Sequence, residues 1–247
     1  MGKLWDRIRG IRDKRRPFCT VVVAAAGQSR RMSGENKLLM DLRGAPVLMR
    51  TLCALDQAAL VDEIIVATRE ELLLEIADLC SRSALTKPVR VVKGGDTRTA
   101  SVLAAAVEAD PRAELIAVHD GARPLVRPEM IDELIRQGES TFAVAPAVPV
   151  TDTVKVTDGN GRVTGTPDRK TLFAVQTPQV FQASILKAAL QSAMEAGAEL
   201  TDDCSAVERL GKEVYLTPGD PENIKITTPL DLLVASAILE RRGGEGV

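Results

Sequence analysis

Four short segments of this chain combine small residues with charged ones in a pattern that suits an anionic or polar ligand. The first reads AAAGQSRRM over residues 24–32, and Lys37 follows six residues after Arg31. Small residues let the backbone approach a ligand closely, and the cationic side chains after them would meet phosphate groups. The segment lacks the glycine spacing of a dinucleotide fingerprint or a P-loop, so a solvated basic loop is the competing interpretation.

The second and fourth segments add glycines and one conspicuous lysine. The second, KGGDTRTAS over residues 93–101, places two glycines before a predicted helix. It would suit a flat polar ligand such as a nucleobase, and a capped turn explains it equally well. The fourth, PENIKIT over residues 221–227, carries Lys225 between two isoleucines. In an extended segment that alternation directs Lys225 either into a site or along the surface as a snorkelling lysine.

The third segment, VHDGARP over residues 118–124, puts Asp120 at the end of an apolar run. A carboxylate there is well placed to hold Mg²⁺. His119 is a candidate general base, although packing beside the strand is the commoner role for such a residue. Arg123 is either a ligand-binding cation or a salt-bridge partner of Asp120.

The elements that must position these segments alternate between β-branched apolar runs and amphipathic patterns. That order predicts an α/β fold with a mostly parallel mixed sheet and helices on both faces, which gathers the loops at the carboxyl ends of the strands. The predicted strands are Thr20–Ala25, Glu63–Thr68, Val89–Val92, Leu115–Val118, Phe142–Ala145, Thr171–Val175 and Glu213–Leu216. The predicted helices are Pro46–Leu55, Glu70–Cys80, Thr97–Ala109, Pro128–Glu139, Ser184–Ala196, Ser205–Leu210 and Pro229–Arg241.

The stretch from about residue 148 to 170 breaks the alternation. Two β-branched segments, Thr153–Thr157 and Arg162–Thr166, flank the sequence DGNG, which is a strong hairpin signal. An isolated hairpin is marginal in water and must pack on something. We therefore expect a projecting arm used for self-association, with a plain surface hairpin as the alternative.

The last predicted helix has a clear start. Thr228 is the expected N-cap, Pro229 the first helical residue and Asp231 the partner in a capping box. Its apolar face is predicted to comprise Leu230, Leu233, Val234, Ala237 and Ile238.

The amino-acid composition argues against several classes of protein. The 247 residues carry 45% hydrophobic and 27% charged residues with a net charge of −2, which is ordinary for a globular protein. The net charge disfavours a broadly basic surface, though it allows a local cationic pocket, and together with an aromatic content of 2% it argues against a nucleic-acid partner. No stretch approaches the ~20 apolar residues of a membrane span.

The chain has one histidine and four widely spaced cysteines without a C-x-x-C pair. This predicts free thiols in a reducing, cytoplasmic compartment and disfavours a histidine-based zinc site. The basic residues 14–16 before the apolar run 18–26 loosely imitate a signal peptide, but a buried strand behind a basic tail fits better. We therefore expect a basic extension over residues 1–17 and one domain over 18–247 that includes the arm.

The segments are far more specific together than singly. In their order they resemble the 2-C-methyl-D-erythritol 4-phosphate cytidylyltransferases of the nonmevalonate isoprenoid pathway. The similarity runs from about Cys19 to Leu239 and rests on AAAGQSRRM with Lys37, GGDTRTAS, VHDGARP, TDTVK, DR at 168–169, QTPQ, LTDDCSAVE and ENIKIT. The chain departs from the usual pattern at Ala24 in place of proline, Ser29 in place of glycine and Gly121 in place of alanine, and the interval from Arg31 to Lys37 is one residue shorter than in some members.

The resemblance implies a Rossmann-like nucleotidyltransferase fold and transfer of CMP from CTP to methylerythritol phosphate, a sugar-alcohol phosphate, with Mg²⁺ and release of pyrophosphate. It implies that Arg31 and Lys37 grip the CTP phosphates and that Arg169 and Lys225 position the acceptor. The residues it assigns to cytosine or ribose are Ala25, Ala26, Gly27, Gly95, Asp96 and Ser101. It assigns metal and substrate binding to Asp120, and the acceptor pocket to Arg123, Thr153 and Thr201.

The resemblance also implies a homodimer whose hairpin arm reaches the partner's site, so that Thr153 and Arg169 would act in the neighbouring subunit. Two other functions stay open from the sequence. A ribitol-5-phosphate cytidylyltransferase shares several of the blocks, and the pocket around Thr153, Arg169 and Thr201 would decide between the acceptors. A nucleotide-binding protein without catalysis is the more distant alternative.

Overall fold

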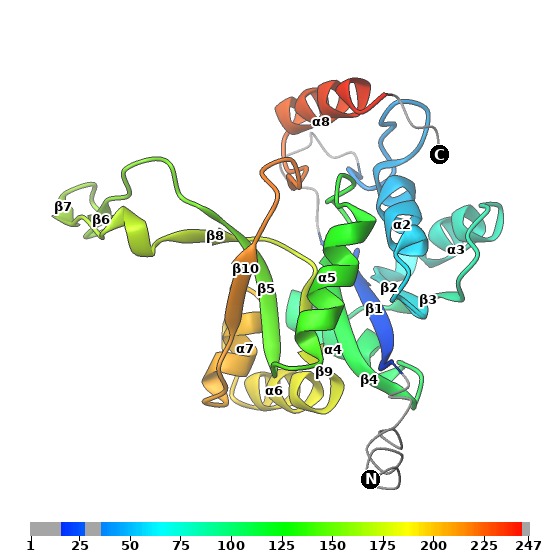
Figure 1. Ribbon diagram of the computed structural model, residues 1–247, viewed down its shortest axis with the longest axis horizontal. Helices are drawn as coiled ribbons and strands as arrows, with labels where there is room; N and C mark the ends of the chain where they lie inside the picture. Colours follow the sequence, from blue (N-terminus) through cyan, green and yellow to red (C-terminus); the bar gives the residue numbers. More distant parts are fainter. Residues whose placement is uncertain (1–15, 28–35, 244–247) are drawn as a thin grey trace, which may run out of the picture.

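A mostly parallel sheet forms the centre of the computed structural model, which describes residues 16–27 and 36–243 (Figure 1). The strand order is β10-β5-β9-β4-β1-β2-β3, and β8 pairs with β5 beside that path. The strands are β1 (Phe18–Ala24), β2 (Glu63–Thr68), β3 (Val89–Lys93), β4 (Ala113–Asp120), β5 (Ala143–Pro149), β8 (Phe173–Val175), β9 (Gln179–Gln182) and β10 (Tyr215–Pro218).

The parallel strands end at one level of the sheet. Ala24, the last residue of β1, lies opposite Ala67 in β2 and Asp120 in β4. Lys93 of β3 lies opposite Thr68 of β2. The four loops that follow these strands therefore emerge side by side, as expected for a ligand site of an open α/β sheet.

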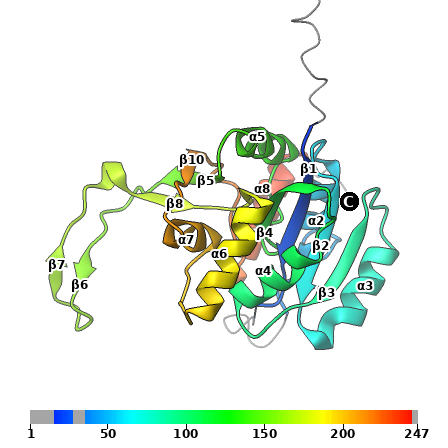
Figure 2. The ribbon, with the colours of Figure 1, turned by 90° about the horizontal axis from the view of Figure 1, so that it is seen from below.

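Helices cover both faces of the sheet, as predicted (Figure 2). One face packs against α2 (Val47–Gln57), α3 (Leu73–Ser81) and α5 (Pro128–Gly138), and the other against α4 (Arg98–Val107), α6 (Ala183–Glu195) and α7 (Asp203–Arg209). Alternate residues of β1 enter the two cores, with Val21 and Val23 on one face and Val22 on the other. This burial on both faces explains why β1 is an unbroken apolar run.

Several predicted boundaries need correction. Strand β9 was not predicted, because its four residues lie between Pro178 and the start of α6 and give too short a pattern. The strand predicted from residue 171 begins with a 3₁₀ turn, η2 (Arg169–Thr171), and only Phe173–Val175 is extended. The helix predicted from residue 70 likewise opens with a 3₁₀ turn, η1 (Glu70–Leu72).

Helix α8 (Pro229–Arg241) lies across the top of the molecule in Figure 1. Its bounds and its capping box are confirmed, since Thr228 accepts from the Asp231 amide and the Asp231 carboxylate accepts from the Thr228 amide. The apolar face named from the sequence meets the core only in part, through Ile238. Leu230 and Leu233 are 66% and 69% exposed, whereas Ala235 is fully buried. The helix has apolar residues on two stripes, and periodicity alone does not say which one meets the core.

The hairpin arm projects away from the body of the molecule (Figures 1 and 2). Its strands β6 (Val156–Thr157) and β7 (Val163–Gly165) are antiparallel and shorter than predicted. The turn is held by Asp158, which accepts from the backbone amides of Asn160 and Arg162. The arm valines at 156 and 163 are about half exposed, at 48% and 53%.

Two further observations concern the cysteines and the search for a membrane-spanning helix. All four cysteines are free thiols, as predicted, with Cys19 and Cys204 buried. Among the helices of the described ranges, none is both long enough and apolar enough to cross a bilayer.

Candidate active site

A pocket of about 820 Å³ lies at the carboxyl ends of β1 to β4. Nine residues singled out in the sequence line it: Ala25, Ala26, Gly27, Lys37, Gly95, Asp96, Ser101, Asp120 and Lys225. They come from four segments spread over 200 residues of chain. The common level of the ends of β1 to β4 brings three of these segments together, and Lys225 of the fourth pairs with Asp120. Arg31, predicted to grip the phosphates, lies outside the described residues.

The other four predicted residues do not line this pocket. Arg123 lies behind it and contacts Asp120 instead. Thr153 and Arg169 are exposed on the arm, where Arg169 donates to the Thr151 carbonyl at 2.7 Å. Thr201 is exposed just before α7, and its hydroxyl lies 3.0 Å from that of Ser205.

The loop after β3 is tied down by Ser101. The Ser101 hydroxyl accepts from the Gly95 amide at 3.1 Å and lies 3.0 Å from the Gly95 carbonyl. A side chain at Gly95 would place a Cβ atom 2.5 Å from that of Ala100, so only glycine fits there without a shift. Thr97 caps α4 by accepting from the Ala100 amide. The result is a fixed loop whose backbone faces the pocket at the positive end of a helix.

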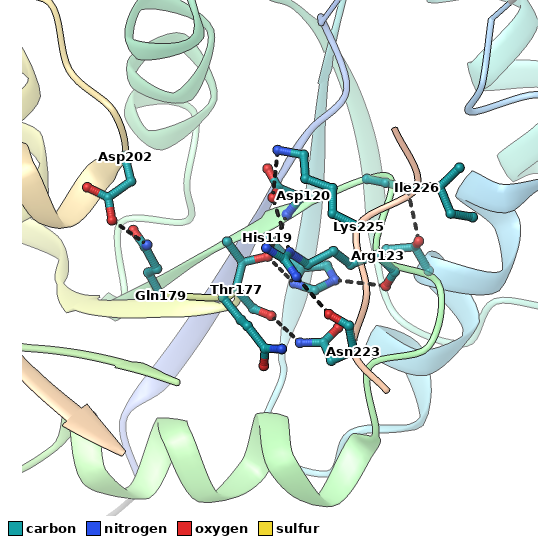
Figure 3. A network of polar contacts seen from close by, with 12 residues as sticks. His119, Asp120, Arg123, Thr177, Gln179, Asp202, Asn223, Lys225 and Ile226 are labelled. Atoms are coloured by element: carbon teal, nitrogen blue, oxygen red, sulfur yellow. Dashed lines mark hydrogen bonds and ion pairs between the residues drawn. The ribbon is translucent and has the colours of Figure 1, made fainter. Parts of the chain in front are cut away.

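Asp120 stands at the centre of the charged groups (Figure 3). Its Oδ2 lies 2.9 Å from Lys225 Nζ and 3.2 Å from Arg123 Nε. Burial works to raise the pKa of the carboxyl, but the positive charges of Lys225, Arg98 and Arg123 outweigh it and hold the pKa well below its usual value. Asp120 is therefore a permanent anion at the floor of the pocket.

Lys37 approaches the same point from another segment. Its Nζ donates to the carbonyl of Ile226 at 2.9 Å, next to Lys225 in the chain. The two ammonium groups thus enter one pocket from loops 188 residues apart (225 − 37). Lys225 lines this pocket and pairs with Asp120, with its side chain 39% exposed.

A polar network fixes the strand end behind Asp120. The Asp120 amide donates to Thr177 Oγ1 at 3.0 Å, and that hydroxyl lies 3.0 Å from His119 Nδ1. The Thr177 carbonyl accepts from Asn223 Nδ2, and the Asn223 carbonyl accepts from Arg123 (Figure 3). These bonds join β4 to the loop that carries Lys225, so the ion pair is held from both sides.

His119 belongs to this network and not to the pocket. Because Thr177 Oγ1 accepts from a backbone amide, its own proton is available to His119 Nδ1, and His119 Nε2–H can then donate to the Arg123 carbonyl at 3.3 Å. The ring is fully buried, and desolvation lowers its pKa to about 4. His119 is thus a neutral packing residue, which was the commoner of its two interpretations.

Three cations that line the pocket have no individual role assigned from the sequence: Arg69, Lys93 and Arg98. Arg69 directly follows β2, and Lys93 is the last residue of β3. Because ligands bind at the carboxyl ends of parallel strands, the argument that singled out Asp120 applies to these two residues as well. Arg98 lies inside the GGDTRTAS segment, at the start of a predicted helix, and Asp203 lies inside LTDDCSAVE. Their pairing across 105 residues has no signal in the sequence.

No group of three or more His, Cys, Asp or Glu side chains within residues 16–27 and 36–243 is arranged to hold a metal ion. Among the described residues that line the pocket, Asp120 is the one buried, ionised carboxylate. A single carboxylate completed by substrate phosphates and water is a common way to bind Mg²⁺. The site therefore fits a cation that arrives with a phosphorylated ligand.

The class of protein follows from three features: the topology of the sheet, the fixed glycine loop and the cationic pocket. Together they are those of a Rossmann-like nucleotidyltransferase. The family model for 2-C-methyl-D-erythritol 4-phosphate cytidylyltransferase matches residues 19–241. The chain belongs to this family.

Relatives that carry the name of this family are similar to the chain over nearly their whole length. The protein from Caldanaerobacter subterraneus is 42% identical over 228 residues, covering 90% of this chain and 99% of the relative. The one from Bacillus pumilus is 43% identical, with 92% and 99% covered. Among solved structures, 4-diphosphocytidyl-2C-methyl-D-erythritol synthase from Anaerococcus prevotii superposes with a TM-score of 0.82 at 31% identity, covering 92% of this chain and all of that one.

The buried neutral histidine gives a prediction for stability. The unfolded chain takes up a proton at His119 near the ordinary pKa of 6.5, whereas the folded chain does so only near 4. Between these two pKa values the unfolded state therefore binds more protons than the folded state. The free energy of unfolding falls as the pH decreases through this range, by at most about 1.4 kcal/mol per pH unit. His119→Gln should flatten this slope in urea unfolding between about pH 6.5 and about pH 5. Parallel slopes in the two proteins would mean that His119 titrates normally when folded.

Proposed function

We propose that the protein transfers CMP from CTP to 2-C-methyl-D-erythritol 4-phosphate, giving 4-diphosphocytidyl-2-C-methyl-D-erythritol and pyrophosphate. The observation that carries this proposal is the family match over residues 19–241, combined with Lys37, Asp120 and Lys225 in one pocket. The same match favours an enzyme over a binding protein without catalysis, since the relatives are named as transferases.

The reaction sets an electrostatic problem. An oxygen of the acceptor phosphate forms a bond to the α-phosphorus of CTP, and the bond to the bridging oxygen breaks so that pyrophosphate leaves with the electron pair. Two like charges about 4 Å apart repel by about 4 kcal/mol at an effective dielectric constant of about 20. Fixed cations must offset several such pairs, and they also stabilise the charge that builds on the leaving oxygen.

The lysines of the pocket suit that task. Lys37 and Lys225 are both held by partners on the protein, at 2.9 Å from the Ile226 carbonyl and from Asp120 respectively. Held cations need no reorganisation when the charge develops. Arg31 is proposed to act with them on the triphosphate. No general base is required, because the attacking phosphate oxygen is already ionised near neutral pH.

We propose Mg²⁺ as the cofactor, with Asp120 as its protein ligand. The ion would supply further positive charge to the phosphates of CTP. In this arrangement Asp120 holds Lys225 and Arg123 in place until the metal and nucleotide arrive. The nucleoside would lie against Ala25, Ala26 and Gly27 on one side and against the fixed loop of Gly95, Asp96 and Ser101 on the other.

The acceptor half of the site is proposed to be shared between two subunits. Thr153 and Arg169 belong to the arm, are exposed, and do not line the pocket of their own chain. A homodimer in which each arm reaches the other subunit's pocket would add these residues and would cover the exposed arm valines. Arg123 and Thr201 would complete the acceptor pocket from the body. The free thiols support a cytoplasmic location.

Release of pyrophosphate from CTP tests the proposed reaction directly. We expect turnover with methylerythritol phosphate and Mg²⁺, loss of turnover when the metal is chelated, and recovery when Mg²⁺ is added back. Ribitol 5-phosphate is the matched acceptor and should be used at least tenfold less well, on the order of what a missing or misplaced polar contact costs. Equal or better use of ribitol 5-phosphate would reassign the acceptor.

Lys37 should be required for the chemical step. Lys37→Ala is expected to lower kcat by roughly 10²–10³, the scale of one lost contact to the developing charge. Lys212→Ala is the control, because Lys212 is an exposed lysine stacked over Phe142 and remote from the pocket. Arg31→Ala should behave like Lys37→Ala. Near-normal kcat in both pocket variants would remove them from the mechanism.

Subunit mixing tests the shared site. Lys37→Ala damages the pocket and Arg169→Ala the arm, so a mixed dimer has one doubly damaged site and one intact site. Co-expression in equal amounts should restore about a quarter of wild-type activity, since about half of the dimers are mixed. Lys37→Ala mixed with Lys225→Ala is the control and should stay inactive, because both changes lie in the same pocket. No recovery in the first mixture would place Arg169 in its own subunit's site.

A further inference from the structure

An ion pair joins the nucleotide side of the pocket to the segment that carries Thr201. Arg98 is the first residue of α4 and lines the pocket, and Asp203 is the first residue of α7. Arg98 donates to Asp203 Oδ2 at 2.7 Å across 105 residues of chain. The Asp203 side chain is only 1% exposed, while that of Arg98 is 33% exposed. The pair is thus anchored inside the protein and open on the side of the pocket.

The two helix starts that it connects are otherwise rigid. On the α4 side, Thr97 caps the helix and Ser101 fastens the glycine loop. On the α7 side, Asp202 caps the helix by accepting from the Ser205 amide, and it also accepts from Gln179 of β9 at 2.8 Å. A movement of Arg98 therefore requires the Arg98–Asp203 contact itself to break.

The positive charge of Arg98 also lowers the pKa of the Asp120 carboxyl. Together with Lys225 and Arg123, it opposes the effect of burial on the pKa of the Asp120 carboxyl. Asp203 lies two residues after Thr201, the predicted acceptor contact. Arg98 therefore lines the pocket together with Asp120, the proposed metal ligand, and contacts a residue two positions after Thr201.

A purely structural role explains this pair poorly. Asp203 Oδ1 is buried and has no hydrogen-bond partner among the described residues, so the carboxylate is only partly satisfied. Burying an ion pair costs desolvation, and well-packed apolar residues often replace such a pair with no loss of stability. A half-satisfied buried carboxylate that holds a pocket-lining arginine points to a task in the pocket.

We propose that Asp203 is a positioning residue that fixes the Arg98 guanidinium in the pocket, and that Arg98 contributes positive charge to the acceptor side of Asp120. This inference rests on the proposed CMP transfer. A planar guanidinium suits the place, because it can hold a carboxylate with one edge and meet a phosphate with another.

Steady-state kinetics of Asp203→Asn test the role. The substitution keeps the shape but removes the charge that aligns Arg98. We expect kcat/KM for methylerythritol phosphate to fall by roughly tenfold to a hundredfold, the scale of a misaligned group, while KM for CTP stays within about twofold.

Glu63→Gln is the matched control. Glu63 is a buried carboxylate that Arg90 contacts at 2.7 Å, at the end of β2 away from the pocket. Both variants should lower the melting temperature, but only Asp203→Asn should change the use of the acceptor. Equal kinetics in Asp203→Asn and Glu63→Gln would overturn the inference and leave the proposed function intact.

The double variant R98L/D203L covers the case in which Asp203→Asn does not fold, since it removes both charges and leaves no buried ion. It should fold, bind CTP in an equilibrium titration and still show the reduced kcat/KM for the acceptor. Wild-type acceptor kinetics in the double variant would overturn the inference. Wild-type enzyme that binds CTP but releases no pyrophosphate with methylerythritol phosphate would instead overturn the proposed function, and the inference with it.

Discussion

The site is organised around a buried carboxylate that stays charged because cations surround it. Asp120 ends a strand in the middle of the sheet, where removal from water would normally favour the neutral acid. Lys225, Arg123 and Arg98 reverse that preference. Each of these cations comes from a different segment of the fold, so the charge balance at Asp120 depends on the correct placement of several loops at once. Conversely, the attraction to Asp120 helps to hold those loops in place.

This arrangement suits a reaction limited by repulsion between phosphates and not by proton transfer. The chain contains one histidine, which is buried, neutral and occupied in a hydrogen-bond network behind the strand. The pocket is instead lined by Lys37, Lys225 and Arg98. Catalysis then consists of alignment and charge compensation, as in other phosphoryl and nucleotidyl transfers. The polar network through Thr177 and Asn223 supports this by fixing the cations before substrate binds.

The fold consists of a body, which contains the pocket, and a projecting arm. The body holds the nucleotide pocket between strand ends whose register is set by a continuous parallel sheet. The arm has a two-stranded tip and exposed valines, and its Arg169 does not line the pocket of its own chain. In the proposed homodimer, a second subunit would cover the arm and complete the acceptor half of the site.

The sequence by itself determined the α/β class, the bounds of β2 and α8, the capping box at Thr228, and nine of the residues that line the pocket, because these depend on local pattern and on motifs at strand ends. It did not determine strand β9, the buried stripe of α8 or the Arg98–Asp203 pair. Those depend on which surfaces meet after the chain has folded. A short strand pairs only because neighbours flank it, and a helix with two apolar stripes buries the one that faces the core. An ion pair across 105 residues exists only once the fold has brought the starts of α4 and α7 together.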